Sequence, residues 1–186
     1  MFIQTQATPN PATLKFLPGM EVISGAPLDF RNESEAGKSP LVSALFAIDG
    51  ITGVFLGSDF ISVTKGDSDW GHVKPAVLGT IMDHFLSGNP VLEDEAQFDD
   101  DNEDEFFDPK DSETVEVIKE LLNTRVRPAV AMDGGDIIFK GFKDGIVFLK
   151  MQGACSGCPS STATLKNGIE NLLRHFVPGV EEVQQI

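Results

Sequence analysis

The chain has 186 residues, 41% of them hydrophobic, and a formal net charge of −15 at pH 7. It contains no run of about 18 consecutive apolar residues, so the sequence excludes a membrane-spanning helix and predicts a soluble protein. No basic patch interleaved with aromatic residues is present, which argues against nucleic acid as a partner.

The first half of the chain predicts two β-hairpins and two helices. Short apolar runs bounded by turn residues indicate four strands, at residues 2–7, 13–17, 53–57 and 60–64. Ser39 and Pro40 offer the N-cap and first position of a short amphipathic helix. A second helix is indicated by apolar residues at every fourth position, namely Val73, Val77, Ile81 and Phe85. We therefore expect a first domain, residues 1–87, in the order ββαββα.

Most of the negative charge lies in one segment. Residues 93–113 hold 12 acidic residues against Lys110 alone, whereas residues 1–92 carry 9 acidic and 5 basic residues and residues 114–186 carry 8 of each. A block of like charges repels itself and stays extended and solvated. We interpret residues 88–111 as a disordered, flexible acidic linker, with a docking tail for a basic partner as the alternative.

The second half, residues 112–186, predicts the order αββαβ. Asp111 or Ser112 can cap a helix that Arg127-Pro128 is expected to end. A hairpin over 136–142 and 146–151 turns at an Asp-Gly step, and a second helix from Pro159 precedes a short strand over 180–186. The fold class is thus α+β, with two small domains of antiparallel hairpins packed with helices. For the paired glycines Gly134 and Gly135, a tight turn and a direct role at a site are both open.

The chemistry of the chain centres on its only two cysteines, Cys155 and Cys158. They form a Cys-Ser-Gly-Cys loop immediately before Pro159. Because Pro is favoured at the first position of a helix, Cys158 is expected beside the N-cap, where free N–H groups and the positive helix end favour a thiolate. One such pair supplies half of the ligands of a four-thiolate zinc or iron-sulfur site.

Four interpretations of the cysteine pair follow. The cysteines can be buried and inert, or they can exchange disulfides as in thioredoxin-like proteins, although the motif here follows a hairpin late in the chain. They can also bind a metal or cluster shared by two subunits, since two facing loops around a two-fold axis supply four thiolates. Zinc within one chain fails, because His175 is 17 residues beyond Cys158, about 25 Å along a helix.

Two further observations limit the function. His72 and His84 lie 12 residues apart without a nearby third ligand, which favours packing or surface roles over a metal site. Two cysteines three residues apart make a poor disulfide framework, and no secretory or transit leader is apparent. The sequence therefore predicts a cytoplasmic protein, or one of the mitochondrial matrix if a leader has been removed.

Several segments closely resemble a known family. In the second half these are Met132-Asp-Gly-Gly-Asp-Ile, Gly145-Ile-Val-Phe-Leu, Gly153-Ala-Cys-Ser-Gly-Cys-Pro-Ser-Ser161 and Leu165-Lys-Asn-Gly-Ile169. They resemble the C-terminal domain of NifU, in the Nfu family. The segments Met1-Phe-Ile-Gln-Thr-Gln, Thr8-Pro-Asn-Pro and Leu14-Lys-Phe-Leu-Pro-Gly19 are similar to the Nfu N-terminal domain.

The resemblance implies an iron-sulfur cluster scaffold or carrier and not an enzyme. It implies a [4Fe-4S] cluster, built from iron and inorganic sulfide, that Cys155 and Cys158 of two subunits bind together in a homodimer. It further implies that upstream assembly proteins supply the cluster and that apo iron-sulfur proteins receive it. Thiolate count by itself does not separate a [2Fe-2S] from a [4Fe-4S] cluster, because both take four cysteines.

Overall fold

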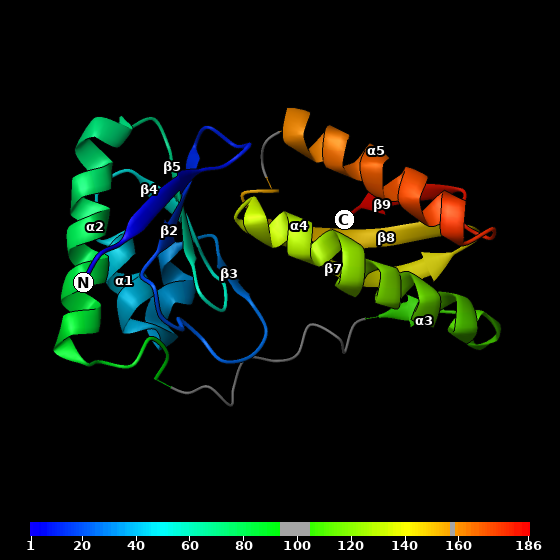
Figure 1. Ribbon diagram of the computed structural model, residues 1–186, viewed down its shortest axis with the longest axis horizontal. Coiled ribbons are helices and arrows are strands. Elements are labelled where there is room, and N and C mark those ends of the chain that lie inside the picture. Colours follow the sequence, from blue (N-terminus) through cyan, green and yellow to red (C-terminus); the bar gives the residue numbers. More distant parts are fainter. Residues whose placement is uncertain (94–104, 157–158) are drawn as a thin grey trace. The chain divides into compact units, whose positions relative to one another are not determined.

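A computed structural model describes residues 1–93, 105–156 and 159–186, although not the side chains of residues 159–161 (Figure 1). The chain divides into two compact units, residues 1–98 and 99–186, and each combines one sheet with helices. The α+β class with two units is therefore confirmed. The acidic run over 94–104 and Cys158 lie outside the described residues. In the described part, every helix is too short or too polar to cross a bilayer.

The first unit contains a five-stranded antiparallel sheet in the order β1-β2-β5-β4-β3. Its strands are β1 (Gln4–Ala7), β2 (Thr13–Leu17), β3 (Leu28–Phe30), β4 (Ile51–Leu56) and β5 (Ile61–Lys65). Its helices are α1 (Pro40–Phe46), α2 (Trp70–Ser87) and the 3₁₀ helix η1 (Glu33–Lys38). The two predicted hairpins and both helices are confirmed. Strand β3 and η1 were not predicted, because each is short and lacks a clear apolar period.

Helices α1 and α2 pack on one face of this sheet (Figure 1). Alternate residues of the strands point toward the helices, as the two-residue period of a strand requires. Three of the predicted helix positions, Val73, Val77 and Ile81, are buried in the same core. The apolar face of the helices and the apolar face of the strands thus pack together in one core.

Hydrogen bonds of Ser39 connect the start of α1 to the segment that follows α2. The Ser39 hydroxyl is fully buried; it accepts a hydrogen bond from the Val42 amide (3.2 Å) and donates one to the Val91 carbonyl (2.6 Å). The first bond is the predicted N-cap, and the second crosses 52 positions of sequence. Ser39 therefore fixes both the helix start and the segment that follows α2.

The second unit contains a mixed four-stranded sheet in the order β6-β7-β8-β9. Its strands are β6 (Phe106–Phe107), β7 (Gly135–Lys143), β8 (Ile146–Gly153) and β9 (Glu182–Gln185). The central pair β7 and β8 is the predicted hairpin, and Asp144 (φ 52°) and Gly145 (φ 80°) form its two-residue turn. Both outer strands, β6 and β9, pair in parallel with their neighbours. Strand β6 was not predicted.

The helices of this unit are α3 (Ser112–Leu121), α4 (Arg127–Met132) and α5 (Pro159–Phe176), with a 3₁₀ turn, η4 (Pro109–Asp111), before α3. The prediction that Arg127-Pro128 ends the first helix is wrong. A π-helical turn, η5 (Leu122–Val126), joins α3 to α4, and the Arg127 amide reaches back to the Leu122 carbonyl. This wider turn accommodates the missing amide hydrogen and the ring of Pro128.

Replacing Ser39 with Ala should remove both of its hydrogen bonds and leave the carbonyl of the partly buried Val91 without this partner. We expect the first unit to lose about 1–2 kcal/mol of stability. Chemical denaturation of the full chain, with Trp70 fluorescence reporting on the first unit, measures the change. Thr52→Ala, at an exposed strand position, is the matched control and should change stability much less. Equal effects of the two substitutions would contradict the role given to Ser39.

Candidate functional site

The cysteine loop connects the end of β8 to the start of α5. Gly153 closes β8 in a left-handed conformation (φ 63°), which favours glycine. The Ser156 amide and hydroxyl both donate to the Gly153 carbonyl, at 3.1 and 2.9 Å. The Thr162 hydroxyl, one turn into α5, donates to the Cys155 carbonyl at 2.9 Å. Three hydrogen bonds thus hold the first half of the loop in a tight turn.

Cys155 points into the core of the second unit. Its residue surface is only 7% exposed, and it packs with the apolar residues of β7, β8 and the helices. Cys158 lies outside the described residues, so the predicted place of its thiol beside the helix N-terminus stays a prediction. In the described part of the chain, no group of three or more His, Cys, Asp or Glu side chains is arranged to hold a metal ion.

The paired glycines lie directly against the cysteine loop. Gly135 opposes Gly153 across the β7–β8 ladder, and the Ala154 amide donates to the Gly134 carbonyl at 3.2 Å. A Cβ atom on Gly135 would lie 2.7 Å from the Cys155 sulfur and 2.6 Å from the Gln152 carbonyl oxygen. Gly134 has φ 81° and makes the turn into β7. The predicted tight turn is therefore present at Gly134, and Gly135 forms one wall around Cys155, while a direct role of the glycines at a functional site stays a prediction.

A partly buried ion pair stabilises this wall. Arg127 binds Asp136 through two parallel hydrogen bonds of 2.8 Å, from Nε to Oδ1 and from Nη2 to Oδ2. The Asp136 side chain is 5% exposed and that of Arg127 37%. The hydrogen bonds that Arg127 donates to Asp136 raise the pKa of Arg127. Sequence reasoning did not identify this pair, because it depends on α4 continuing past Pro128 to present Arg127 beside β7.

The surroundings of Cys155 favour its protonated thiol. Burial, followed by the negative charges of Asp133 and Asp136, raises the pKa of Cys155 from 9.0 to about 12. The prediction that the helix N-terminus favours a thiolate concerned Cys158. At Cys155, burial and the nearby negative charges instead favour the neutral thiol. Cys155 can therefore act as a thiolate ligand only if binding removes its proton and the loop brings the sulfur out of the core.

The histidines lie on α2 and α5, and none belongs to a group of possible metal ligands among the described residues. His72 and His84 occupy the first and last turns of α2, about 18 Å apart along the helix axis. His84 is 8% exposed, and burial lowers its pKa. His175 is in the last turn of α5, where its ring meets Phe176 edge-on at 4.9 Å. The length of α5 places His175 about 24 Å from Pro159, in agreement with the sequence argument.

Comparison with protein families places both halves of the chain. Residues 3–88 match the family model described as scaffold protein Nfu/NifU N terminal, and residues 118–184 match the NifU-like domain. The protein called NFU1 iron-sulfur cluster scaffold homolog, mitochondrial, from Homo sapiens is 51% identical over 188 aligned positions, covering 100% of this chain and 72% of the human protein.

The protein of the same name from Drosophila sechellia is 52% identical, again over the whole of this chain. The chain spans 65% of that relative's length. Among solved structures, the solution NMR structure of a NifU-like protein from Saccharomyces cerevisiae aligns with a TM-score of 0.47 and 24% identity. That alignment covers 51% of this chain and 87% of the yeast chain.

Substituting Ala for Gly135 should displace the cysteine loop, because the new methyl group would overlap the Cys155 sulfur. We expect the second unit to lose about 1–3 kcal/mol of stability and Cys155 to become more reactive toward a thiol reagent. Gly168→Ala, at an exposed helix position with open space around it, is the control and should stabilise the unit by about 0.5–1 kcal/mol. Wild-type thiol reactivity in the Gly135 variant would contradict the contact.

The raised pKa of Cys155 predicts slow alkylation in a Cys158→Ser chain. At pH 8 the folded chain should react with iodoacetamide about a thousandfold more slowly than the same chain in guanidinium chloride, because its thiolate is scarcer. The stability that the thiol contributes is complete below pH 9.0 and falls as the pH rises toward about 12, since the unfolded chain loses its proton first. Equal rates in the folded and unfolded chains would contradict the protonated, buried thiol.

Proposed function

Because the chain belongs to the Nfu/NifU family of iron-sulfur cluster scaffold proteins, we propose that it binds a [4Fe-4S] cluster between two copies of itself. In this proposal Cys155 and Cys158 of each subunit supply the four thiolates. The chain passes the cluster to apo iron-sulfur proteins after upstream assembly proteins deliver it. The cluster is cargo, and the protein is a carrier that catalyses no reaction.

The proposal rests on two facts: the chain has two cysteines, and both lie in one loop between a strand and a helix. One chain has two cysteines, and a four-iron cluster takes four thiolates, so two chains complete the site without other ligands. The loop joins a strand end to a helix start, and Gly135 provides a wall without a side chain. A two-fold axis near this loop would place two copies of it face to face.

Binding must be coupled to a local rearrangement. The Cys155 sulfur is packed into the core in the described form, whereas a cluster ligand must meet the iron of a shared site. The loop is held by a few hydrogen bonds to Gly153, Gly134 and Thr162, so a local opening does not require the unit to unfold. Iron binding would compensate for this opening and for the proton that the thiol releases.

Burial of Cys155 is also what an inert cysteine pair would show, and a shared zinc site would use the same four thiolates. A dithiol that exchanges disulfides needs an accessible thiolate, which the described surroundings of Cys155 disfavour. Family membership favours the cluster over the other interpretations. Iron, sulfide and zinc content together with native mass separate these four interpretations.

The proposal also assigns a role to each segment of the chain and a cellular compartment to the protein. Residues 1–87 recognise partners, residues 88–111 act as the tether, and residues 112–186 hold the cluster. The relatives compared above are named as mitochondrial proteins, which gives no support to the cytoplasmic prediction. We therefore place the protein in the mitochondrial matrix, the alternative that the sequence had left.

Anaerobic reconstitution with iron and sulfide should give about four irons and four sulfides per dimer, with broad charge-transfer absorption. Cys155→Ser and Cys158→Ser should each abolish the cluster. Ser156→Ala, which changes the same loop but keeps both thiols, is the matched control and should retain it.

Native mass measurement of the same samples should show a dimer only when the cluster is bound. Stoichiometric zinc without iron would favour the structural zinc site. A colourless monomer that reduces insulin disulfides would favour the redox dithiol, and one that binds no metal and reduces nothing would favour an inert pair.

A further inference from the structure

The first described residues after the acidic run attach to the outer edge of the second sheet. Phe106 and Phe107 form β6 and pair in parallel with Gly141 and Phe142 of β7. The pairing covers two of the nine residues of β7. A strand that is so short, at the end of a long connection, is bound to its sheet by few backbone hydrogen bonds. We call residues 105–108 the edge clip.

Specific side-chain contacts hold the edge clip in register. Lys119 of α3 donates to both carboxylate oxygens of Glu105, each at 2.8 Å, and the Glu105 side chain is 11% exposed. The Phe106 ring lies over Gly141 and meets the Phe148 ring at 5.2 Å between centroids. A Cβ atom on Gly141 would lie 2.5 Å from the Phe106 ring. The groove is therefore a site for an acid followed by an aromatic residue.

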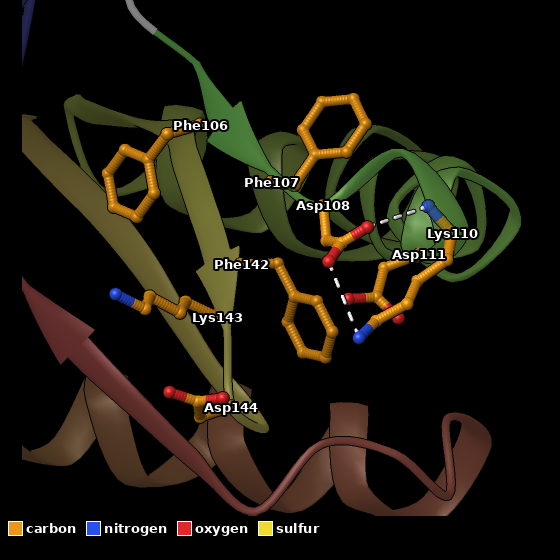
Figure 2. Close-up of a pocket in the computed structure, with 8 residues that line it drawn as sticks. All are labelled: Phe106, Phe107, Asp108, Lys110, Asp111, Phe142, Lys143 and Asp144. Atoms are coloured by element: carbon orange, nitrogen blue, oxygen red, sulfur yellow. Dashed lines mark hydrogen bonds and ion pairs between the residues drawn. The ribbon is translucent and has the colours of Figure 1, made fainter.

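The clip is also poorly buried. Phe106 is 42% exposed and Phe107 37%, and their rings point to opposite sides of the strand (Figure 2). The ion pair joins Lys119, whose side chain is 37% exposed, to the more buried Glu105, and partly exposed pairs of this kind contribute modestly to stability. Segments with few buried contacts open at low free energy. The edge of β7 is thus paired over two residues by a segment whose two aromatic side chains are largely exposed.

An open cavity lies directly beside the clip. It has a volume of about 310 Å³ and is lined by Phe107, Phe142, Lys110 and Lys143 with three aspartates, namely Asp108, Asp111 and Asp144 (Figure 2). Asp108 is engaged with Lys110 through a 3.4 Å ion pair and a hydrogen bond to its amide. The cavity gives an incoming segment room to approach the strand edge before the clip has left.

We propose that the edge clip is a built-in occupant of a peptide-docking groove on β7. The same groove accepts an extended segment of a partner protein in which an acidic residue precedes two aromatic residues. The segment adds a parallel strand to β7, so backbone hydrogen bonds supply affinity, while Lys119 and the space over Gly141 supply selectivity. The clip competes with the partner and also shields the edge from non-specific strand pairing.

The test uses the full chain and a fluorescein-labelled peptide that copies residues 103–109, Glu-Asp-Glu-Phe-Phe-Asp-Pro. Phe106→Ala in the chain weakens its own clip, so fluorescence anisotropy should show the peptide binding about tenfold more tightly than to the unmodified chain. Phe2→Ala, at an exposed phenylalanine of the other unit, should leave the affinity unchanged. A peptide with both phenylalanines replaced by Ala should not bind.

A charge exchange tests the register within the Phe106→Ala chain. Adding Lys119→Glu should reduce the affinity for the copy peptide, and a peptide with Lys in place of the glutamate that copies Glu105 should regain it. No binding by the Phe106→Ala chain, or equal affinity of the Phe2→Ala and Phe106→Ala chains, would overturn the proposal. So would dimerisation of the Phe106→Ala chain without peptide binding, which would assign the edge to a second copy.

Discussion

The close approach of two backbone segments at the open end of the β7–β8 hairpin is the constraint on which the site depends. Gly135 and Gly153 face each other there, and the Cys155 sulfur occupies the space that a side chain on Gly135 would fill. The Arg127–Asp136 pair holds the start of β7 at this distance. The position of the first thiol is thus set by the missing side chain of Gly135, a left-handed turn and a partly buried ion pair acting together.

This arrangement gives the site two opposing properties. A tightly packed, protonated thiol is protected from oxidation and from stray metals, since the thiolate is the reactive form. The proposed cluster binding would require the same thiol to become accessible. The loop packs Cys155 into the core, while few hydrogen bonds hold the residues around it. Burial thus protects the thiol, and a local opening of the loop would expose it without unfolding the unit.

The sequence predicted most of the regular elements because their periodic patterns are local. The hairpin turn at Asp144-Gly145, the Ser39 cap and the Pro159 helix start each depend on a few neighbouring residues. The elements that sequence reasoning missed depend on distant partners. Strand β6 forms because Lys119 binds Glu105 and because Gly141 leaves space for the Phe106 ring. The helix continues through Pro128 because the π-helical turn before it has room for the proline ring. The sequence left the burial of Cys155 open as one of several interpretations, because that burial depends on the contact with Gly135.

The parallel pairing of β9 with β8 affects the order of events during synthesis. Val183 is fully buried in the core of the second unit, and its amide donates to Glu170 of α5 at 3.2 Å. The sheet and α5 therefore cannot complete their packing until Glu182–Gln185 has left the ribosome, whereas the first unit has all its strands long before. On a nascent chain the core that buries Cys155 therefore stays incomplete until β9 has emerged.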